Sequence, residues 1–319
     1  MVELLREGMD AGATGLSSGV FYATGAAADI DELRAARAAS PATRAASTRR
    51  TSATRCDKVL DSLDEAFATG RRGSVPVVVS HHKCAGPRNW GRTRADARAH
   101  RRRAHAAADR RSTCYPYIAG STVLRKRNGR RHHRHHGHVV DAASGDGRRA
   151  CSPPSRGEWG CTQQEACERL QPGGACYFQM REDDVQRVLK YPATMIGSDG
   201  LPHDQHPHPR LWGTFPRVLG HYSRELGLFS LETAVHKMSG LSARQFRLED
   251  RGEIREGAYA DIVVFDAATV KDVATFEQPK ALSLGIECVL VNGAIAYRFG
   301  DASQASAADG SAAERRETP

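Results

Sequence analysis

Apolar residues recur at helical spacing in several stretches of the chain. In residues 57–69, Val59, Leu60, Leu63 and Phe67 share one face, so this segment is predicted to be an amphipathic helix. Comparable patterns predict further helices over residues 2–12, 27–38, 162–170, 181–190, 217–227 and 230–239. Short apolar runs separate these segments, and such alternation is typical of an α/β protein.

Those short apolar runs predict strands. The run VPVVVSHHK, residues 75–83, is uniformly β-branched at its centre, which indicates a strand buried on both faces, as parallel sheets require. Residues 13–20 and 115–121 are each expected to form a strand with a turn, and residues 193–200 a strand that ends in polar residues. The strands end in His, Lys, Ser or Asp, and in a (β/α) barrel the chemistry gathers at the carboxyl ends of the strands. Because only about half of the eight βα units of such a barrel can be counted, we predict an incomplete TIM-type (β/α) barrel.

The pattern changes after residue 250. Residues 251–300 contain short strand patterns joined by glycine turns, which predicts a small β unit that follows a barrel portion at residues 1–250. Residues 301–319 are rich in Ala, Ser, Asp and Gly and are expected to form a disordered tail.

The net charge of +9 is concentrated in the middle of the chain. Residues 40–56 hold four Arg and no acidic residue, and residues 91–160 hold seventeen Lys and Arg against five Asp and Glu. The rest of the chain is acidic overall, as in many enzymes. The Arg-rich stretch 94–130 matches no nucleic-acid-binding motif, so we expect no nucleic-acid partner.

Membrane, secretion and disulfide signals are missing from the sequence. No apolar run approaches the ~20 residues of a membrane span, and the N-terminus MVELLREGMDAG lacks the apolar segment of a secretory signal. The eight cysteines are scattered without a CxxC pair, which fits reduced thiols. We therefore expect a cytoplasmic protein with no membrane partner.

Two residues at predicted strand ends are candidates for chemistry. His81 follows a buried strand, where a neutral imidazole can bind a metal or simply bond to the backbone. Asp199 follows another strand, where a carboxylate can bind a metal, carry a proton or stabilise a turn. The histidine cluster HHRHHGH, residues 132–138, lacks flanking apolar periodicity, so we do not expect a specific metal site there.

Cations and aromatic residues near these strand ends allow two interpretations. The guanidinium of Arg210 offers a planar fork that matches a carboxylate, whereas isolated cations such as Lys83 are usually solvated. Tyr115, Tyr177 and Met180 can line a pocket or belong to the core.

Longer segments combine into a family resemblance. They are AGATGLSSGVFY, VLDSLDEAFATGRR, VPVVVSHHKCAGPRNWGRT, YPYIAGSTVLR, EWGCTQQEACERLQPGGACYFQM and IGSDGLPHDQHPHPRLWGTFPRVLGHYSRELG. They resemble the N-acyl-D-amino-acid deacylases (D-aminoacylases) of the metal-dependent amidohydrolase superfamily. The segments GEIREGAYADIVVFD and VLVNGAIAY resemble the superfamily's C-terminal β-sandwich strands, which would make 251–300 part of a small β-sandwich. The resemblance covers most of residues 1–38, 57–93, 115–125 and 158–300.

The resemblance implies roles for individual residues. His81 matches the metal-ligand histidine of the family's SHxK motif, and Lys83 matches its lysine near the metal and substrate. Asp199 matches the catalytic aspartate, and Arg210 matches the arginine that holds the substrate α-carboxylate. The remaining matches in the substrate site are Tyr115 and Ser121 beside Arg210, and Phe21, Tyr177 and Met180 around the amino-acid side chain.

The resemblance also implies zinc-dependent hydrolysis of N-acyl-D-amino acids to a D-amino acid and a carboxylate. Zinc lowers the pKa of bound water, and Asp199 would take the water proton and pass it to the departing nitrogen. Arg210 would fix the α-carboxylate, so that one Cα configuration presents its amide. Phe21, Tyr177 and Met180 favour neutral side chains over D-glutamate or D-aspartate. We expect the protein to act on this small molecule as a monomer.

The sequence departs from the family in three respects. The family's N-terminal part, with its HxH metal pair and metal-binding cysteine, is missing, and ASTRRTSATRC stands where a further metal-binding histidine belongs. Residues 94–113 and 126–157 replace an expected helix and strand with Arg- and His-rich sequence. We hypothesise that 40–56, 94–113 and 126–157 are irregular, out-of-frame translations of a GC-rich gene, which resequencing of the locus tests.

These departures predict a truncated and inactive chain. His81 is the one protein metal ligand that remains clearly matched, and catalytic zinc sites use about three. Two alternatives stay open: a non-catalytic substrate-binding remnant, and a basic nucleic-acid-associated protein that uses residues 94–150.

Overall fold

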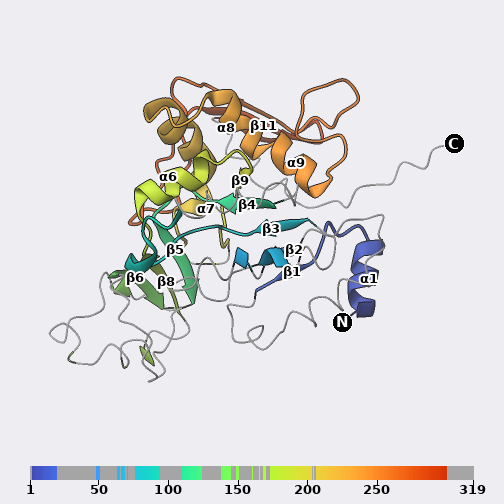
Figure 1. The fold of residues 1–319 in the computed structure, drawn as a ribbon. Helices are drawn as coiled ribbons and strands as arrows, with labels where there is room; N and C mark the ends of the chain where they lie inside the picture. Colours follow the sequence, from blue (N-terminus) through green and yellow to red (C-terminus); the bar gives the residue numbers. More distant parts are fainter. Residues whose placement is uncertain are drawn as a thin grey trace.

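The protein is a mixed α/β structure with three separate sheets in the part of the chain that is described (Figure 1). The computed structural model describes residues 2–19, 48–50, 63–64, 66–68, 70, 76–93, 110–123, 138–144, 149–150, 160, 165, 168–169, 173–202, 204 and 206–299. The helix expected at 27–38, most of that expected at 162–170, the tail 301–319 and Phe21 lie outside these residues.

The central sheet is parallel and has the strand order β1-β2-β3-β4-β9. Its strands are β1 (Ser17–Ser18), β2 (Thr48–Arg50), β3 (Val77–Val79), β4 (Arg110–Cys114) and β9 (Thr194–Ile196). The side chains of β3 are all buried and the strand has a parallel neighbour on each side, as the β-branched run predicted. Among the described residues the sheet has two free edges and does not close into a barrel.

One predicted strand is only partly correct, because residues 119–121 belong to a strand and residues 115–118 do not. Residues 115–118, at the start of the expected strand 115–121, form the connection between β4 and β5 (Ala119–Val123). Pro116 has no N–H to donate to a ladder, and Tyr115 and Tyr117 leave the sheet to pack in the core. The strand of the parallel sheet lies just before them, where the polar sequence RRSTC conceals it. The strand expected at 13–20 is confirmed only as the short β1.

Parts of the basic segments are regular structure, contrary to expectation. Strands β2 and β4 fall in or overlap residues 40–56 and 94–113, while β6 (His138–Ser144) and β7 (Arg149–Ala150) fall within 126–157. Backbone ladders do not depend on apolar side chains, so Arg-rich sequence can pair where neighbouring strands are in place. The structure thus contains regular strands at these positions, and the out-of-frame hypothesis stays a prediction that resequencing tests.

Two antiparallel sheets flank the central one (Figure 1). The first has the order β5-β8-β6-β7, with β8 spanning Gly173–Phe178. The second has the order β10-β11-β12, formed by β10 (Ile262–Phe265), β11 (Ile286–Val291) and β12 (Ala294–Arg298). This second sheet confirms the small β unit that the glycine-turn pattern after residue 250 predicted.

Most of the helices lie on the side of the central sheet where the C-terminal sheet also lies (Figure 1). They are α6 (Glu182–Lys190), α7 (Arg210–Arg217), the π-helix η3 (Val218–Glu225), α8 (Leu231–Met238) and α9 (Gly240–Phe246), while α1 (Val2–Asp10) lies near the N-terminus and η1 (Pro87–Asn89) is a single turn. Helix α6 begins with three acidic residues and ends with basic ones, which complements the helix dipole. Both α6 and α8 contact β9.

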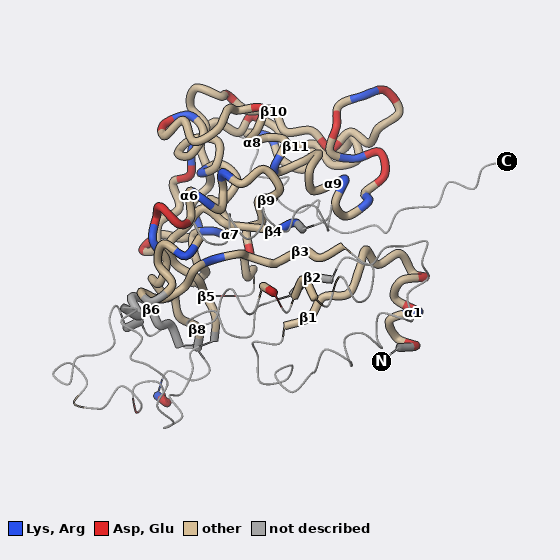
Figure 2. Tube along the Cα trace, in the orientation of Figure 1, with Lys and Arg blue, Asp and Glu red and all other residues tan. Residues whose placement is uncertain are grey.

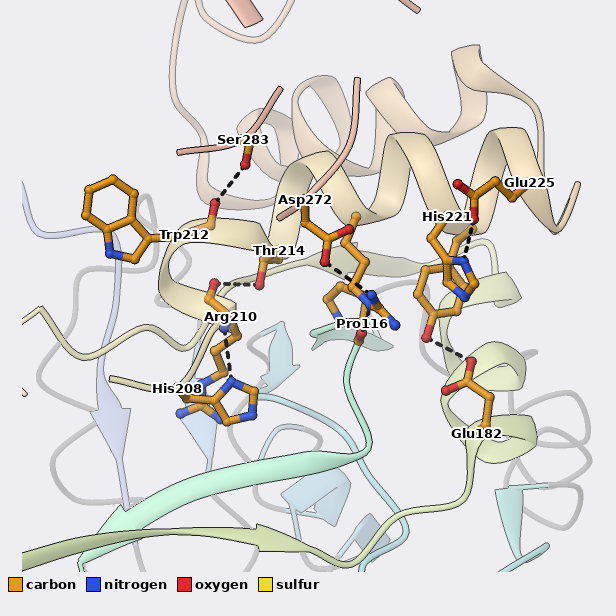
Figure 3. A network of polar contacts seen from close by, with 12 residues as sticks. Pro116, Glu182, His208, Arg210, Trp212, Thr214, His221, Glu225, Asp272 and Ser283 are labelled. Carbon is orange, nitrogen blue, oxygen red and sulfur yellow. Dashed lines mark hydrogen bonds and ion pairs between the residues drawn. The ribbon is translucent and has the colours of Figure 1, made fainter. Parts of the chain in front are cut away.

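The helix expected at 217–227 begins earlier than predicted. Helix α7 starts at Arg210, directly after Pro209, and includes Pro216. Because Pro216 has no N–H, the carbonyl of Trp212 lacks its usual helical partner, and the Ser283 hydroxyl donates to that carbonyl at 3.4 Å (Figure 3). Because of Pro209 and Pro216, the sequence pattern did not predict a helix over these residues. The first residue of this helix, Arg210, is a candidate for ligand binding.

The main core lies between α6, η3, α8 and the loop after β4. It includes Tyr115, Tyr117, Val188, Leu189 and Tyr222. A second cluster joins Leu63, Ala66 and Phe67 to β3, which confirms the apolar face predicted around Leu63 and Phe67.

The described surface is mixed in charge. Figure 2 shows acidic and basic residues side by side along α6 and around α9, and Arg244 pairs with Glu253 at 2.9 Å. None of the described helices combines the length and apolar character needed to cross a membrane.

Candidate active site

The predicted chemical residues gather at one edge of the central sheet. Strands β3, β4 and β9 run parallel to one another, so their carboxyl ends meet at the same edge. His81 and Lys83 follow β3, Tyr115 follows β4, and Asp199 follows β9. Segments more than a hundred residues apart in sequence therefore deliver their polar side chains to a common region.

Two of these residues have unusual backbone conformations. His81 has a φ of 40° and Asp199 a φ of 52°, both in the left-handed region that residues other than glycine rarely adopt. The amide of His81 donates to Thr113 Oγ1 at 2.8 Å, which ties the turn after β3 to β4. Strained conformations of this kind cluster at functional sites because the surrounding structure has to enforce them.

Lys83 and Tyr115 contact each other directly. The ammonium group of Lys83 donates a hydrogen bond to the Tyr115 hydroxyl and lies 4.5 Å from the centre of the Tyr115 ring. Gly120 makes room for this pair, since a Cβ there would lie 3.1 Å from the Tyr115 hydroxyl and 3.8 Å from Lys83 Nζ. Any side chain at position 120 would crowd the contact.

Arg210 is buried at the start of α7 and stacks on the same tyrosine. Its guanidinium carbon lies 4.6 Å from the centre of the Tyr115 ring, and its Nη2 lies 3.0 Å from Asp199 Oδ2. Arg210 is only 1% exposed, yet its Nε and Nη1 have no hydrogen-bond partner among the described residues. Buried donors without partners are costly, so these groups are poised to bind an anionic or carbonyl ligand.

Gly200 allows α7 to approach Asp199. A Cβ at position 200 would lie 2.5 Å from Leu211 Cδ1 and 3.0 Å from Leu211 Cα. Because Leu211 directly follows Arg210, the missing side chain sets how closely the first turn of α7 packs against the SDG loop.

His208 holds the other side of Arg210 and was missed by the sequence reasoning. Its Nδ1 accepts the backbone N–H of Arg210 at 3.0 Å, as Figure 3 shows, and its Nε2 lies 3.1 Å from the carbonyl oxygen of Ala119 on β5. Burial, together with the nearby charges of Arg210 and Lys83, holds the pKa of His208 well below its usual value. The available signal was the spacing in HPHPR, where a histidine precedes the arginine by two residues.

The expected pocket residues lie on the adjoining sheet. Ser121 is on β5 and faces Cys176 across the ladder, while Tyr177 on β8 faces Gly120. Met180 is 6% exposed and packs in the main core with Tyr115. The cavity that Met180 lines together with Lys83 and Tyr115 has a volume of about 10 Å³, close to that of one water molecule, so here Met180 is a packing residue.

A metal site is not complete in the described part of the chain. No group of three or more His, Cys, Asp and Glu side chains converges there in a way that suits a metal ion. His81 stands at the strand end that the resemblance implies for a ligand, but catalytic zinc sites use about three protein ligands. The described residues therefore do not fit a zinc ion by themselves.

Comparison with known proteins identifies related sequences. Residues 164–297 match the model of the amidohydrolase family. The chain is 45% identical over 308 residues to a D-aminoacylase of Alcaligenes xylosoxydans xylosoxydans, covering 92% of this chain and 60% of that protein. It is 41% identical to an N-acyl-D-glutamate deacylase of the same organism, again covering 60% of the relative. The chain thus spans about three-fifths of the length of these relatives.

Solved structures of a D-aminoacylase and of a related deacylase also match this chain. A structure of N-acyl-D-glutamate deacylase from Bordetella bronchiseptica, complexed with zinc and a phosphonate inhibitor that mimics the tetrahedral intermediate, matches with a TM-score of 0.87 and 39% identity. The match covers 95% of this chain and 64% of that one. A D-aminoacylase studied for its binuclear metal centre matches with a TM-score of 0.83 and 40% identity, covering 94% of this chain and 64% of that one. The resemblance found in the sequence is therefore confirmed.

Proposed function

We propose, from the amidohydrolase match and the kinship with D-aminoacylases and related deacylases, that this chain carries the substrate-binding part of an enzyme that hydrolyses N-acyl-D-amino acids. The products would be a D-amino acid and a carboxylate. In this proposal the parallel sheet β1-β2-β3-β4-β9 is a portion of a TIM-type barrel within residues 1–250, and residues 251–300 contribute strands of a small β-sandwich.

The observation that carries the proposal is the buried guanidinium of Arg210. It has two donor groups without partners among the described residues, and it lies beside Asp199 and over the ring of Tyr115, which Lys83 also contacts. A substrate α-carboxylate would satisfy these donors and balance the local positive charge of Arg210 and Lys83. In this proposal Ser121, on the adjoining strand β5, adds a hydroxyl contact to that carboxylate.

Asp199 is the proposed proton carrier. It would accept a proton from the attacking water as the new C–O bond forms at the amide carbonyl, and then deliver that proton to the nitrogen as the C–N bond breaks. Its side chain is 31% exposed, so water can reach it, and its left-handed backbone turns it toward Arg210. The same turn would place the proton carrier beside the group that fixes the substrate.

Zinc dependence is proposed because the related deacylase was solved with zinc. His81 is the proposed ligand in this chain, and a working site would require ligands beyond the described residues. When bound, zinc would supply a hydroxide from water at neutral pH. Because this ligand set is incomplete, we propose that the chain binds substrate but does not turn it over at an enzyme-like rate.

A neutral D-amino-acid side chain is the proposed specificity. Of the two described residues of the expected pocket, Met180 packs in the core, and Tyr177 carries no charge that would pair with the side chain of D-glutamate or D-aspartate. The curated relatives include a deacylase for each of those acidic substrates as well as a D-aminoacylase. N-acetyl-D-methionine is therefore the probe of choice.

Calorimetric titration of the full chain tests the proposal. We expect N-acetyl-D-methionine to bind, and its carboxamide to bind at least about tenfold more weakly, because a carboxylate–guanidinium contact is worth roughly 1.5–3 kcal/mol. N-acetyl-L-methionine should also bind more weakly, because the opposite Cα configuration cannot place both the carboxylate and the side chain in their sites at once. Equal binding of the carboxamide would refute the role of Arg210. Release of D-methionine at an enzyme-like rate with added zinc would refute the proposed inactivity and leave the substrate assignment standing.

A further inference from the structure

We propose that His208 is a positioning residue, which holds the backbone of Arg210 against strand β5 so that the buried guanidinium presents its two unpartnered donors to the substrate carboxylate. This inference rests on the proposed function, in which Arg210 binds that carboxylate. It assigns to His208 a role that is separate from any contact with substrate.

The two hydrogen bonds of His208 define one form of its ring. Nδ1 accepts from the Arg210 amide, so it carries no proton, and Nε2 must then carry the proton that it donates to the Ala119 carbonyl. A protonated imidazole would lose the acceptor that Arg210 uses. The bridge between α7 and β5 therefore exists only with the neutral ring in this tautomer.

The surroundings of His208 favour that neutral ring. His208 is 3% exposed, and both of the positive groups near it, Arg210 and Lys83, disfavour a further positive charge. These effects lower the pKa of His208 well below its usual value, so the bridge persists across the pH range in which most proteins are studied.

Aromatic packing fixes the orientation of the ring. The His208 ring meets Tyr117 edge to face at a centroid distance of 5.1 Å, and meets Phe276 in the same way at 4.9 Å. Tyr115, on which the Arg210 guanidinium stacks, lies 6.4 Å from the His208 ring. This cluster of rings therefore positions Arg210 in two ways. His208 holds its backbone, and Tyr115 holds its guanidinium.

The bridge links two parts of the proposed carboxylate site. Ala119 begins β5 and lies two residues before Ser121, the proposed hydroxyl contact. Without His208, the first turn of α7 would be attached to the site mainly through the Asp199 ion pair and the packing of Leu211 on Gly200. A small change in that turn would move the guanidinium at the far end of a long side chain.

Three substitutions separate the two bonds of His208. His208→Asn keeps an acceptor for the amide two residues ahead, an arrangement that asparagine adopts readily in turns. His208→Gln keeps a donor for the Ala119 carbonyl but loses the turn acceptor, and His208→Ala loses both. His206→Ala is the matched control, because the His206 ring bonds to the carbonyl of Phe276 at 2.8 Å, whereas the Arg210 amide donates to His208.

Binding of N-acetyl-D-methionine by the full chain is the first measurement. We expect about tenfold weaker binding in His208→Ala and His208→Gln, near-native binding in His208→Asn, and little change in His206→Ala, since one buried hydrogen bond is worth roughly a factor of ten. Equal losses in His208→Asn and His208→Ala would overturn the proposal. The Asn variant keeps the test valid where the Ala variant fails to fold.

A second measurement needs no ligand. The Nε–H of Arg210, assigned in an NMR spectrum by its loss in Arg210→Lys, should be protected from exchange in the native chain and in His208→Asn, but not in His208→Ala. An unchanged Arg210 signal in His208→Ala would overturn the positioning role. If the native chain shows the protected signal but binds no N-acetyl-D-methionine, the proposed function fails while the positioning of Arg210 by His208 stands.

Discussion

Asp199 Oδ2 lies 3.0 Å from Arg210 Nη2, so the proposed proton carrier touches the proposed carboxylate-binding group. Arg210 is almost fully buried, whereas the Asp199 side chain is 31% exposed. A substrate carboxylate that binds Arg210 therefore competes with Asp199 for the same positive charge. This competition predicts that substitutions of Asp199 and of Arg210 change the affinity for substrate in opposite directions.

Replacing the acidic end should tighten binding. In Asp199→Asn the competing anion is gone, and N-acetyl-D-methionine should bind about threefold to fivefold more tightly, in line with a partly exposed ion pair worth up to about 1 kcal/mol. Calorimetry measures the change. Asp183→Asn, which removes an exposed pair with Arg181, is the matched control and should leave binding unaltered. Weaker binding in Asp199→Asn would contradict the competition.

Replacing the basic end should weaken binding. Arg210→Lys keeps the charge but loses the planar set of donors and the stacking on Tyr115, so we expect binding to fall about tenfold or more. The same titration on Arg210→Met should show a larger loss. Native affinity in Arg210→Lys would mean that the charge alone holds the carboxylate.

The contact between Lys83 and Tyr115 should be cooperative. Tyr115→Phe removes the hydroxyl that accepts from Lys83 but keeps the ring next to Arg210, and Lys83→Met removes the donor. In a double-mutant cycle followed by chemical denaturation, the coupling should be about 1 kcal/mol, because both singles break one shared contact. If the losses of unfolding free energy in the two single variants simply add in the double variant, the two side chains do not stabilise each other.

The missing side chain of Gly200 should matter for stability and for binding. Gly200→Ala would place a Cβ 2.5 Å from Leu211 Cδ1 and 3.0 Å from its Cα, which forces α7 away from Asp199. We expect a loss of roughly 1–3 kcal/mol in the free energy of unfolding, together with weaker binding.

Gly8→Ala provides the control for that change. Gly8 lies in α1, and nothing lies within 4 Å of a Cβ built there, so alanine should stabilise the chain by roughly 0.5–1 kcal/mol. Equal effects of the two substitutions would contradict the close approach of α7 at Gly200.

Lys237 should make stability depend on pH. Its ammonium is buried and donates to the carbonyls of Tyr191 and Thr194 at 2.6 and 3.1 Å, and burial lowers its pKa from 10.5 to about 8. Between pH 8 and 10.5 the unfolded chain therefore binds more protons than the folded chain. The contribution of Lys237 to the free energy of unfolding thus falls as the pH drops from 10.5 to about 8, and it is constant below pH 8. The full change is on the order of 3 kcal/mol.

The difference in unfolding free energy between the native chain and Lys237→Met isolates this contribution. It should rise with pH between about 8 and 10.5. Burial raises the pKa of the nearby Cys114 to about 12, which by itself makes stability fall above pH 9.0, and subtracting the variant largely removes that opposing effect. A flat difference for Lys237 would contradict the burial of its charge.

Sequence reasoning found the strand ends but not all of the strands. The β-branched run before His81 and the apolar run before Asp199 both identified strands of the parallel sheet, because burial on two faces leaves a local apolar signature. Strand β4 carries Arg and Ser in place of such a signature and pairs through its backbone. The sequence analysis therefore placed this strand too late in the chain, beginning at Tyr115. The site residue Tyr115 was nevertheless found, through the family resemblance.

The sequence by itself determined which chemistry is available and to which family of enzymes the motifs are related. Residue type and spacing are local properties, and together with the family resemblance they made Lys83, Asp199 and Arg210 candidates for the site. Only the tertiary structure decided that Asp199 pairs with Arg210, that Tyr115 lies between two cations in the contact network, and that His208 bridges α7 and β5. The contacts of Tyr115 with Lys83 and Arg210, and of His208 with Ala119, join parts of the chain that are distant in sequence. They arise because parallel strands bring their carboxyl ends together and small residues let the neighbouring helix approach.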